Sequence, residues 1–276
     1  MTLDSRDRWV RAAEGWEKEA DRFSKASMPV SDALLRAVAP QPGQTILELA
    51  AGLGDTGFLA AELVQPGGTV ITSDFAPEML AAAQRRAAAR NLSNVRFRQI
   101  DLSVPIDQAA ASLDGVICRW GYMLLEDPEA ALRETRRILK HGAAVALAAW
   151  TGPDDNLWSA STVRILQDHG AMERSSEGPG QFTWQDPAVI VEHMEAAGFV
   201  EPEVIAVDFT IPYDDVDDWW VAQTNMSVGT AEADAKLDFA TRSDVLADLE
   251  RAAEPFTQPD ETLLVPARTW VATATA

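Results

Sequence analysis

Residues 45–57, with the sequence TILELAAGLGDTG, join an apolar run to a glycine-rich turn, and this stretch decides the fold class. The apolar half is typical of a buried strand. Gly52, Gly54 and Gly57 follow it and satisfy G-x-G-x-x-G, and residues 57–64 then carry helical signals. Glycines at such a turn let a ligand approach the backbone at the amino end of a helix, where free N–H groups and the helix dipole favour electron-rich atoms. The stretch therefore predicts a strand, a ligand-binding turn and a helix.

The alternation of apolar runs and helical segments continues along the chain. Further apolar runs cover residues 69–74, 95–100, 115–119 and 143–150, and further helical segments cover 77–90 and 128–140. Strand, helix and strand repeated four times predict a parallel sheet with right-handed crossovers and helices on both faces. Helices are also expected at 6–23, 31–39 and, capped by Asp186, at 187–197, and two more strands at 204–211 and 262–272.

Two stretches, residues 151–185 and 212–258, interrupt this pattern between core elements. Insertions beside the carboxyl ends of strands usually shape a substrate site. The alternative is that they only decorate the fold. The predicted organisation is an N-terminal helical cap at 1–40, a ligand-binding core at 41–150, a lid insertion at 151–185, and the rest of the core at 186–276 with a helical insertion at 212–258.

Composition narrows the class of partner. The chain carries 43 acidic and 23 basic residues, a formal charge of −20 with its three histidines neutral, so neither nucleic acid nor an anionic membrane is an expected partner. The longest apolar run, 143–150, is far shorter than the ~20 residues of a membrane helix, and residues 1–7 are too polar for a signal peptide. Cys118 is the only cysteine, which excludes an internal disulfide and fits a reducing compartment. We expect a soluble, cytoplasmic protein, with a homodimer as its candidate assembly.

Acids at later strand ends point to a nucleoside ligand. Asp74 lies 20 residues beyond Gly54, the distance at which a carboxylate accepts hydrogen bonds from ribose hydroxyls. Asp101 follows the third run, where an acid can accept from the exocyclic amine of adenine while Leu102 packs on the ring. Glu48 would repel the pyrophosphate of a dinucleotide but attract the cationic ammonium and sulfonium groups of S-adenosylmethionine. Glu48 therefore favours S-adenosyl-L-methionine over NAD(P) as the cofactor.

Four blocks in this order resemble the class I S-adenosylmethionine-dependent methyltransferases, of the type that includes the ubiquinone and menaquinone biosynthesis methyltransferases (methyltransferase type 11). The blocks are residues 46–57 (ILELAAGLGDTG), 73–80 (SDFAPEML), 97–102 (FRQIDL) and the predicted turn 139–142 (LKHG), and they span roughly half of the chain. The resemblance implies a Rossmann-like, doubly wound α/β fold. Its seven-stranded sheet has an antiparallel last strand at 262–272, with N-terminal helices and helical lid insertions.

The predicted cofactor-binding set is Glu48, Ala50, Ala51, Gly52, Gly54, Asp74, Phe75, Met79, Asp101 and Leu102, and the resemblance implies the following roles within it. The turn lines the methionine part and Asp74 holds the ribose. Phe75 and Met79 flank the adenine, which Asp101 reads together with Leu102. Ala50 departs from the pattern, because the family commonly has the first glycine of its G-x-G-x-G at this place.

Residues 118–123 (CRWGYM) follow the fourth apolar run and are expected on the acceptor side of the cofactor. Ligands of open α/β sheets bind at the carboxyl ends of the strands, where the strand order reverses, here between the first and fourth strands. Arg119 and Trp120 are expected to touch the cofactor through backbone groups, and Tyr122 and Met123 to face the methyl acceptor. The alternative is that Trp120 and Met123 are ordinary core residues.

Six of the nine tryptophans fall in segments expected to cover the site: Trp9, Trp16, Trp158, Trp184, Trp219 and Trp220. Aromatic walls suit an apolar or planar acceptor, and Trp16 is the predicted substrate contact among them. The competing interpretation is that each tryptophan anchors its own helix. Residues 6–23, 151–185 and 212–258 together are predicted to close over the cofactor as a mobile lid.

Candidate bases are few. Of His141, His169 and His193, only His169 has a predicted route to the acceptor, so Tyr122 and His169 are the candidate catalytic residues. Methyl transfer does not require a strong base, because alignment and exclusion of water supply most of the acceleration. The acidic residues at 214–218 are better explained by a helix dipole than by Mg²⁺, so no metal is expected.

Three functions remain open from the sequence. The leading one is a methyltransferase that acts on a small-molecule acceptor by in-line displacement. The others are an NAD(P)-dependent oxidoreductase that uses the same glycine turn, and a cofactor-binding protein that has lost catalysis and acts through its insertions as an interaction module.

Overall fold

The computed structural model describes residues 3–174 and 178–276, so residues 1–2 of the predicted cap and 175–177 of the predicted lid insertion lie outside it. A seven-stranded sheet with the order β3-β2-β1-β4-β5-β7-β6 forms the centre. Neighbouring strands from β3 to β5 pair in parallel, and β7 is antiparallel to both β5 and β6. The strands are β1 (Thr45–Leu49), β2 (Thr69–Asp74), β3 (Val95–Gln99), β4 (Leu113–Arg119), β5 (Leu139–Trp150), β6 (Val200–Tyr213) and β7 (Leu263–Thr275). The predicted seven-stranded sheet with a reversed last strand is confirmed.

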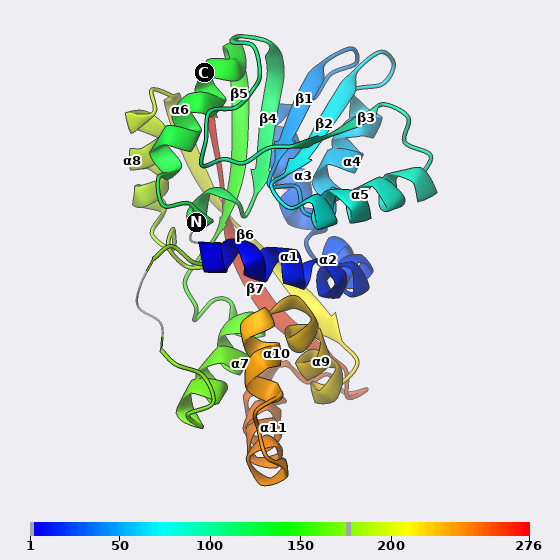
Figure 1. Cartoon of the computed structure of the whole chain (residues 1–276), viewed down its shortest axis with the longest axis vertical. Coiled ribbons are helices and arrows are strands. Elements are labelled where there is room, and N and C mark those ends of the chain that lie inside the picture. The colour runs from blue at the N-terminus through cyan, green and yellow to red at the C-terminus, as the bar shows by residue number, and fades with distance from the viewer. Residues whose placement is uncertain (1–2, 175–177) are drawn as a thin grey trace.

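The helices form two groups (Figure 1). The first flanks the sheet and consists of α3 (Met28–Val38), α4 (Asp55–Leu63), α5 (Pro77–Ala89), α6 (Pro128–Ile138) and α8 (Pro187–Ala196). The second group, here called the cap, consists of α1 (Leu3–Lys18), α2 (Ala20–Ala26), α7 (Leu157–Asp168), α9 (Val216–Met226), α10 (Val228–Asp234) and α11 (Phe239–Ala253). In Figure 1, α1 runs along the lower edge of the sheet, between the strands and the helices of the two insertions.

Local sequence signals explain where several helices begin. Asp186 caps α8 by accepting a hydrogen bond from the backbone N–H of Ala188 at 2.9 Å, as predicted. Asp215 caps α9 in the same way, and its neighbour Asp218 binds Arg22 of α2 through two hydrogen bonds of 2.7 Å. These contacts give two members of the acidic stretch at 214–218 structural tasks.

Three expectations about the elements need correction. The helix expected at 6–23 is two helices, which meet at Glu19; this side chain bonds Asn225 of α9 at 2.7 Å and Arg22 at 3.3 Å. The described chain between β3 and β4 contains no helix, and Arg137 of α6 holds this loop by donating to the carbonyls of Ile106 and Gln108. Residues 139–142 belong to β5 because the sheet continues past them, with Gly142 donating to the carbonyl of Ala276 at 3.0 Å.

Both stretches predicted to be insertions contain helices, and the second begins within β6, whose Pro212 and Tyr213 pair with β7. Residues 151–185 contain α7, and residues 212–258 contain α9, α10, α11 and the short 3₁₀ helix η2 (Glu254–Phe256). Across the described ranges, no helix has the length and apolar character needed to cross a membrane. The exact domain boundaries stay a prediction.

Candidate functional site

The glycine turn between β1 and α4 is held from the neighbouring strand. Ala51 donates its backbone N–H to the carbonyl of Ser73 at 2.8 Å, and Gly52 donates to a carboxylate oxygen of Asp74 at 2.9 Å. Gly52 has a φ of +54°, and a Cβ placed on it would have no atom within 4 Å. The turn therefore presents bare backbone to open space, which fits a ligand that lies against it.

Glu48 lies beneath this turn and has a structural task. Its carboxylate accepts from the N–H of Gly57 at 2.8 Å and from the Thr72 hydroxyl at 3.2 Å, and only 3% of the residue is exposed. A Cβ on Gly57 would lie 2.1 Å from the carboxylate, so glycine is needed there. Burial raises the pKa of Glu48 to about 7. Both oxygens serve the fold, and the raised pKa weakens the argument that Glu48 selects the cofactor by its negative charge.

Ala50 occupies a backbone conformation that favours glycine. Its φ is +48°, a left-handed conformation that costs a residue with a Cβ about 1–2 kcal/mol. A Cβ on Gly121 would lie 2.6 Å from the methyl group of Ala50 and 2.7 Å from the sulfur of Cys118. Gly121 lies on the segment that follows β4, next to Ala50. Because Gly121 has no side chain, it leaves room for the methyl group of Ala50.

Asp74 connects the turn to the next helix. One carboxylate oxygen accepts from Gly52, and the other accepts from the N–H of Ala76 at 3.0 Å. Burial raises the pKa of Asp74, against the opposing effect of these hydrogen bonds. Asp74 thus lies at the carboxyl end of β2, beside the open side of the turn, where the predicted ribose contact requires it.

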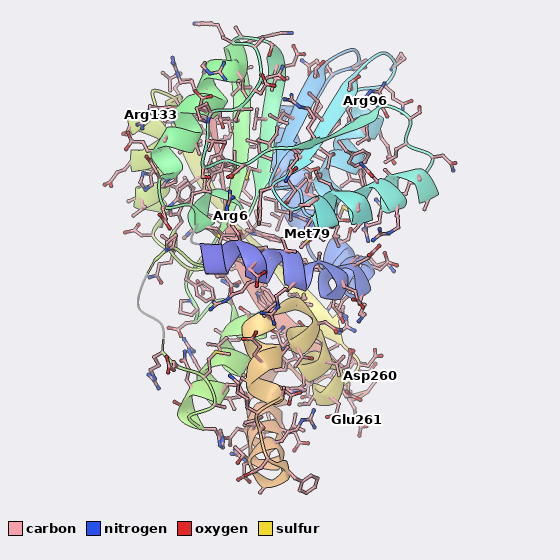
Figure 2. All side chains as sticks on the ribbon, in the orientation of Figure 1. Arg6, Met79, Arg96, Arg133, Asp260 and Glu261 are labelled. Atoms are coloured by element: carbon pink, nitrogen blue, oxygen red, sulfur yellow. The ribbon has the colours of Figure 1, made fainter. Side chains whose placement is uncertain are left out.

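Side chains of α1 cover the predicted adenine contacts. Arg6 forms an ion pair with Asp101, and its guanidinium lies 5.5 Å from the centre of the Phe75 ring. Trp9 and Val10 pack in one apolar cluster with Phe75 and Met79. Arg6 lies on the side of α1 that faces the sheet edge (Figure 2). One cation of the cap therefore contacts two of the groups expected to hold adenine.

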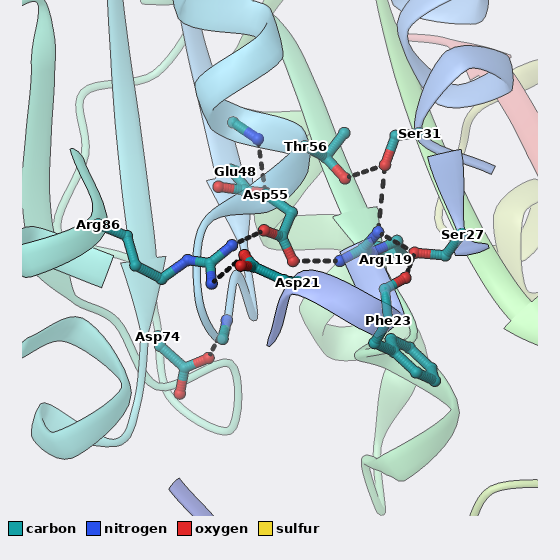
Figure 3. A network of polar contacts seen from close by, with 12 residues as sticks. Asp21, Phe23, Ser27, Ser31, Glu48, Asp55, Thr56, Asp74, Arg86 and Arg119 are labelled. Atoms are coloured by element: carbon teal, nitrogen blue, oxygen red, sulfur yellow. Dashed lines mark hydrogen bonds and ion pairs between the residues drawn. The ribbon is translucent and has the colours of Figure 1, made fainter. Parts of the chain in front are cut away.

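A network of buried charges surrounds Arg119 at the end of β4 (Figure 3). Its guanidinium donates to the hydroxyls of Ser27 and Ser31 at 2.9 and 3.1 Å, and to Asp55, directly after the glycine turn, at 3.2 Å. Arg86 of α5 binds the other oxygen of Asp55 at 2.5 Å. The sequence predicted only a backbone role for Arg119, because its side-chain partners come from two other segments, the start of α3 and the start of α4. Trp120 uses its backbone N–H within the fold, on the carbonyl of Ala148 at 2.9 Å.

Aromatic rings gather at the carboxyl ends of β4 and β5. Trp120 and Trp150 stack with their centres 4.2 Å apart, and Phe23 of α2 lies edge-on to Trp120 at 5.6 Å. Trp16 and Trp158 reach the same Phe23 from α1 and α7, at 5.1 and 5.5 Å. With two further rings they form what is here called the aromatic cluster: Trp9, Trp16, Phe23, Trp120, Trp150, Trp158 and Phe209.

Several predicted acceptor-side residues lie elsewhere. Tyr122 is 1% exposed, bonds the hydroxyl of Thr135 at 2.5 Å and stacks on Trp184, and burial raises its pKa further. Met123 is buried in the main core. His169 bonds Asp248 of α11 at 2.7 Å, within the cap. These positions do not support Tyr122 and His169 as catalytic residues, because the hydroxyl of Tyr122 and Nε2 of His169 are already hydrogen-bonded to Thr135 and Asp248.

The remaining predicted residues are distributed as follows. Leu102 packs against the main core and Ala51 and Gly54 complete the turn. Trp184 stacks on Tyr122 and His193, so its role is that of a packing anchor. The aromatic cluster as a unit was not predicted, because Phe23 and Phe209 carry no local signal that would group them with the tryptophans.

Comparison with known proteins agrees with this geometry. A family model described as a methyltransferase domain matches residues 40–173. Nocamycin O-methyltransferase of Saccharothrix syringae is 31% identical over 193 residues, which cover 66% of this chain and 69% of the relative. Demethylmenaquinone methyltransferase of Thermus thermophilus is 39% identical over 165 residues, or 56% and 73% of the two chains.

Solved structures share the fold at lower identity. The YcgJ protein of Bacillus subtilis is 17% identical with a TM-score of 0.58, over 89% of this chain and 97% of that one. Phosphoethanolamine N-methyltransferase 2 of Haemonchus contortus, solved in complex with S-adenosyl-L-methionine, is 17% identical with a TM-score of 0.53, over 89% and 52%. With the curated relatives, the seven-stranded sheet and the glycine turn in agreement, the chain belongs to the class I S-adenosylmethionine-dependent methyltransferases.

Proposed function

We propose that this protein transfers a methyl group from S-adenosylmethionine to a small, apolar or aromatic acceptor. The observation that carries the proposal is a juxtaposition at one edge of the sheet. The open glycine turn and Asp74 lie at the ends of β1 and β2, and the aromatic cluster lies at the ends of β4 and β5. A cofactor on the first pair of strands would face an acceptor on the second.

The chain offers groups for each part of the cofactor. The backbone at Gly52 would lie against the methionine part, Asp74 would accept from the ribose hydroxyls, and Asp101 with Phe75 would hold the adenine once Arg6 has moved. S-adenosylmethionine, when bound, supplies a methyl group on an electrophilic sulfonium. The aromatic cluster would exclude water from this methyl group and present flat walls to the acceptor.

The relatives support a small acceptor, since their names specify nocamycin and demethylmenaquinone as the molecules on which they act. The absence of nucleic acid, membrane and metal partners, the homodimer and the cytoplasmic location stay predictions.

Calorimetric titration with S-adenosylhomocysteine, S-adenosylmethionine and NAD tests the proposal. We expect the first two to bind and NAD not to bind. Gly52→Val should abolish binding, because a branched side chain fills the open space in front of the turn. Gly170→Val provides a matched control, since Gly170 also has a positive φ of +69° and open space, but lies beyond α7. Binding of NAD alone would overturn the proposal.

A further inference from the structure

Buried polar atoms without a partner concentrate in and around the cap. In native proteins nearly all buried polar groups are hydrogen-bonded, so such atoms need an explanation. In the described part of the chain, seven buried side-chain nitrogen or oxygen atoms have no hydrogen-bond partner. Six of them are Trp16 Nε1, Trp158 Nε1, Thr162 Oγ1, Trp220 Nε1, Gln223 Nε2 and the hydroxyl of Tyr213, which ends β6 beside α9; the seventh, Arg86 Nε, belongs to the network around Asp55.

Three of the six are indole N–H groups, which can only donate. Trp158 is 5% exposed and Trp220 is 2% exposed, so bulk water does not satisfy their N–H groups. The side chain of Gln223 lies close enough to the hydroxyl of Tyr213 to lower the pKa of this tyrosine, whereas burial raises it. That pair is therefore not counted among the free donors.

Two of the indoles lie where the acceptor would bind. Trp16 and Trp158 contact the same Phe23 ring, at 5.1 and 5.5 Å, and Phe23 rests on Trp120, which follows β4. Trp158 also lies 5.2 Å from Trp150 at the end of β5. The unsatisfied donors therefore belong to the aromatic cluster that faces the cofactor side of the sheet edge.

We propose that the methyl acceptor is a flat aromatic compound with an acidic oxygen, a phenol or an enol, and that it is methylated on oxygen. Its oxygen atoms would accept hydrogen bonds from the indole N–H groups of Trp16 and Trp158, while its ring packs among the aromatic side chains. This assignment rests on the methyltransferase function proposed above.

An amine acceptor fits the cluster less well. Aromatic faces attract cations, but here Trp120 and Trp150 turn their faces to each other, 4.2 Å apart. The carboxylates next to the cluster, Glu19 and Asp218, are both bound to Arg22. The free groups of Trp16 and Trp158 are donors, and the single lone pair of a neutral amine cannot both accept from an N–H group and attack the methyl carbon, whereas an oxygen keeps a second lone pair.

The indole N–H groups of Trp16 and Trp158 also make a strong catalytic base unnecessary. An N–H group that bonds an oxygen stabilises its anionic form and so lowers the pKa of a bound phenol or enol. The acceptor gives up its O–H proton to bulk water as it binds, and a lone pair of the resulting oxyanion forms the new bond to the methyl carbon. The bond between methyl and sulfur breaks, and its electron pair stays on sulfur, which leaves neutral S-adenosylhomocysteine. No oxidant or further reactant is required.

The test uses three probes of similar shape: 1-naphthol, 1-naphthylamine and 1-methylnaphthalene. Each is titrated calorimetrically into the full chain in the presence of saturating S-adenosylhomocysteine, and we expect 1-naphthol to bind about tenfold more tightly than the other two. Trp158→Phe and Trp16→Phe each keep an aromatic ring but remove an N–H group. Each substitution should weaken the binding of 1-naphthol about fivefold and leave the binding of 1-methylnaphthalene unchanged. Trp270→Phe is the matched control, because the Trp270 N–H already bonds the carbonyl of Gln185 at 2.9 Å.

The outcomes are separable. The oxygen acceptor would be overturned by equal binding of 1-naphthol and 1-methylnaphthalene, by a preference for 1-naphthylamine, or by no binding of any probe. In each of these cases the methyltransferase proposal stands, provided that S-adenosylhomocysteine binds. Failure of S-adenosylhomocysteine itself to bind would overturn the proposed function instead. The comparison of probes on the unchanged protein decides the matter even where a tryptophan variant does not fold.

Discussion

We predict that Arg6 competes with the cofactor for the groups expected to hold adenine, so that its removal tightens cofactor binding. In the structure Arg6 contacts both Asp101 and Phe75. Adenine cannot use these two groups while the guanidinium occupies them, so part of the binding free energy is spent on displacing it. We therefore expect Arg6→Ala to bind S-adenosylhomocysteine more tightly than the unchanged protein.

The size of the effect follows from the exposure of the two contacts. The side chains of Arg6 and Asp101 are 33% and 28% exposed, so their ion pair is worth no more than a surface pair, about 0.2–1 kcal/mol. The contact with the Phe75 ring adds about 0.5–1 kcal/mol. Together they predict a gain of about 0.7–2 kcal/mol, or roughly three- to thirtyfold in the dissociation constant.

Calorimetric titration at low and high salt checks this prediction. Salt screens the pair between Arg6 and Asp101, so raising it should tighten binding to the unchanged protein and have little effect on Arg6→Ala. Arg11→Ala is the control: Arg11 lies on the same helix and pairs with Glu232 of α10 at 2.7 Å. Weaker binding by Arg6→Ala would refute the reasoning and show that Arg6 helps to hold the adenine, and unchanged affinity would refute it as well.

Three further predictions concern the turn, the ribose contact and the cap. The pKa of Glu48 is about 7 in the folded chain against 4.5 as its ordinary value. The protonated carboxyl therefore contributes to the free energy of unfolding fully below pH 4.5, and this contribution is lost as the pH rises through about 7. Glu48→Gln should therefore be more stable than the unchanged protein at pH 8, by up to about 3 kcal/mol in urea unfolding, and an equal pH profile for both would contradict this. Asp74→Ala should weaken S-adenosylhomocysteine by about 1.5–3 kcal/mol, measured calorimetrically, and unchanged affinity in a folded variant would remove Asp74 from the site. S-adenosylhomocysteine should slow amide hydrogen exchange in residues 6–23, 157–168 and 216–253 while exchange in the core strands stays the same; identical exchange in all three segments would exclude a lid.

The sequence predicted those parts of the fold that depend on local signals. The run at 45–49, the turn glycines and the acids at strand ends are each decided within a few residues, and the structure places them at β1, the turn and the ends of β2 and β3. Asp186 could be identified as the N-cap residue of α8 because its partner Ala188 lies two residues away. The break between α1 and α2 at Glu19 could not be predicted, since it depends on a contact with Asn225, which lies far along the chain.

Side-chain direction limited the prediction of the site. Tyr122 and Met123 follow β4 directly, so their position in the chain suggested the acceptor side. A short 3₁₀ helix, η1 (Tyr122–Leu124), turns the backbone there, and Tyr122 enters the core against α6 and Trp184. Neither the helix nor the partner Thr135 has a signal in the residues at 118–123.

The N-terminal helix shows why the acceptor side was only partly predictable. Its tryptophans and apolar residues indicate a helix that packs on something, and Trp16 was expected near the acceptor on that ground alone. Which surface α1 covers is decided by contacts far along the chain: Arg6 meets Asp101, and at Gly15 α1 comes so close to α9 that a Cβ would lie 1.8 Å from the carbonyl oxygen of Asn225. The same helix that brings Trp16 to the aromatic cluster also brings Arg6 onto Asp101 and Phe75, the predicted adenine contacts. The two halves of the proposed site are thus joined through α1, and this connection depends on the packing of the whole chain, so no single segment of the sequence could predict it.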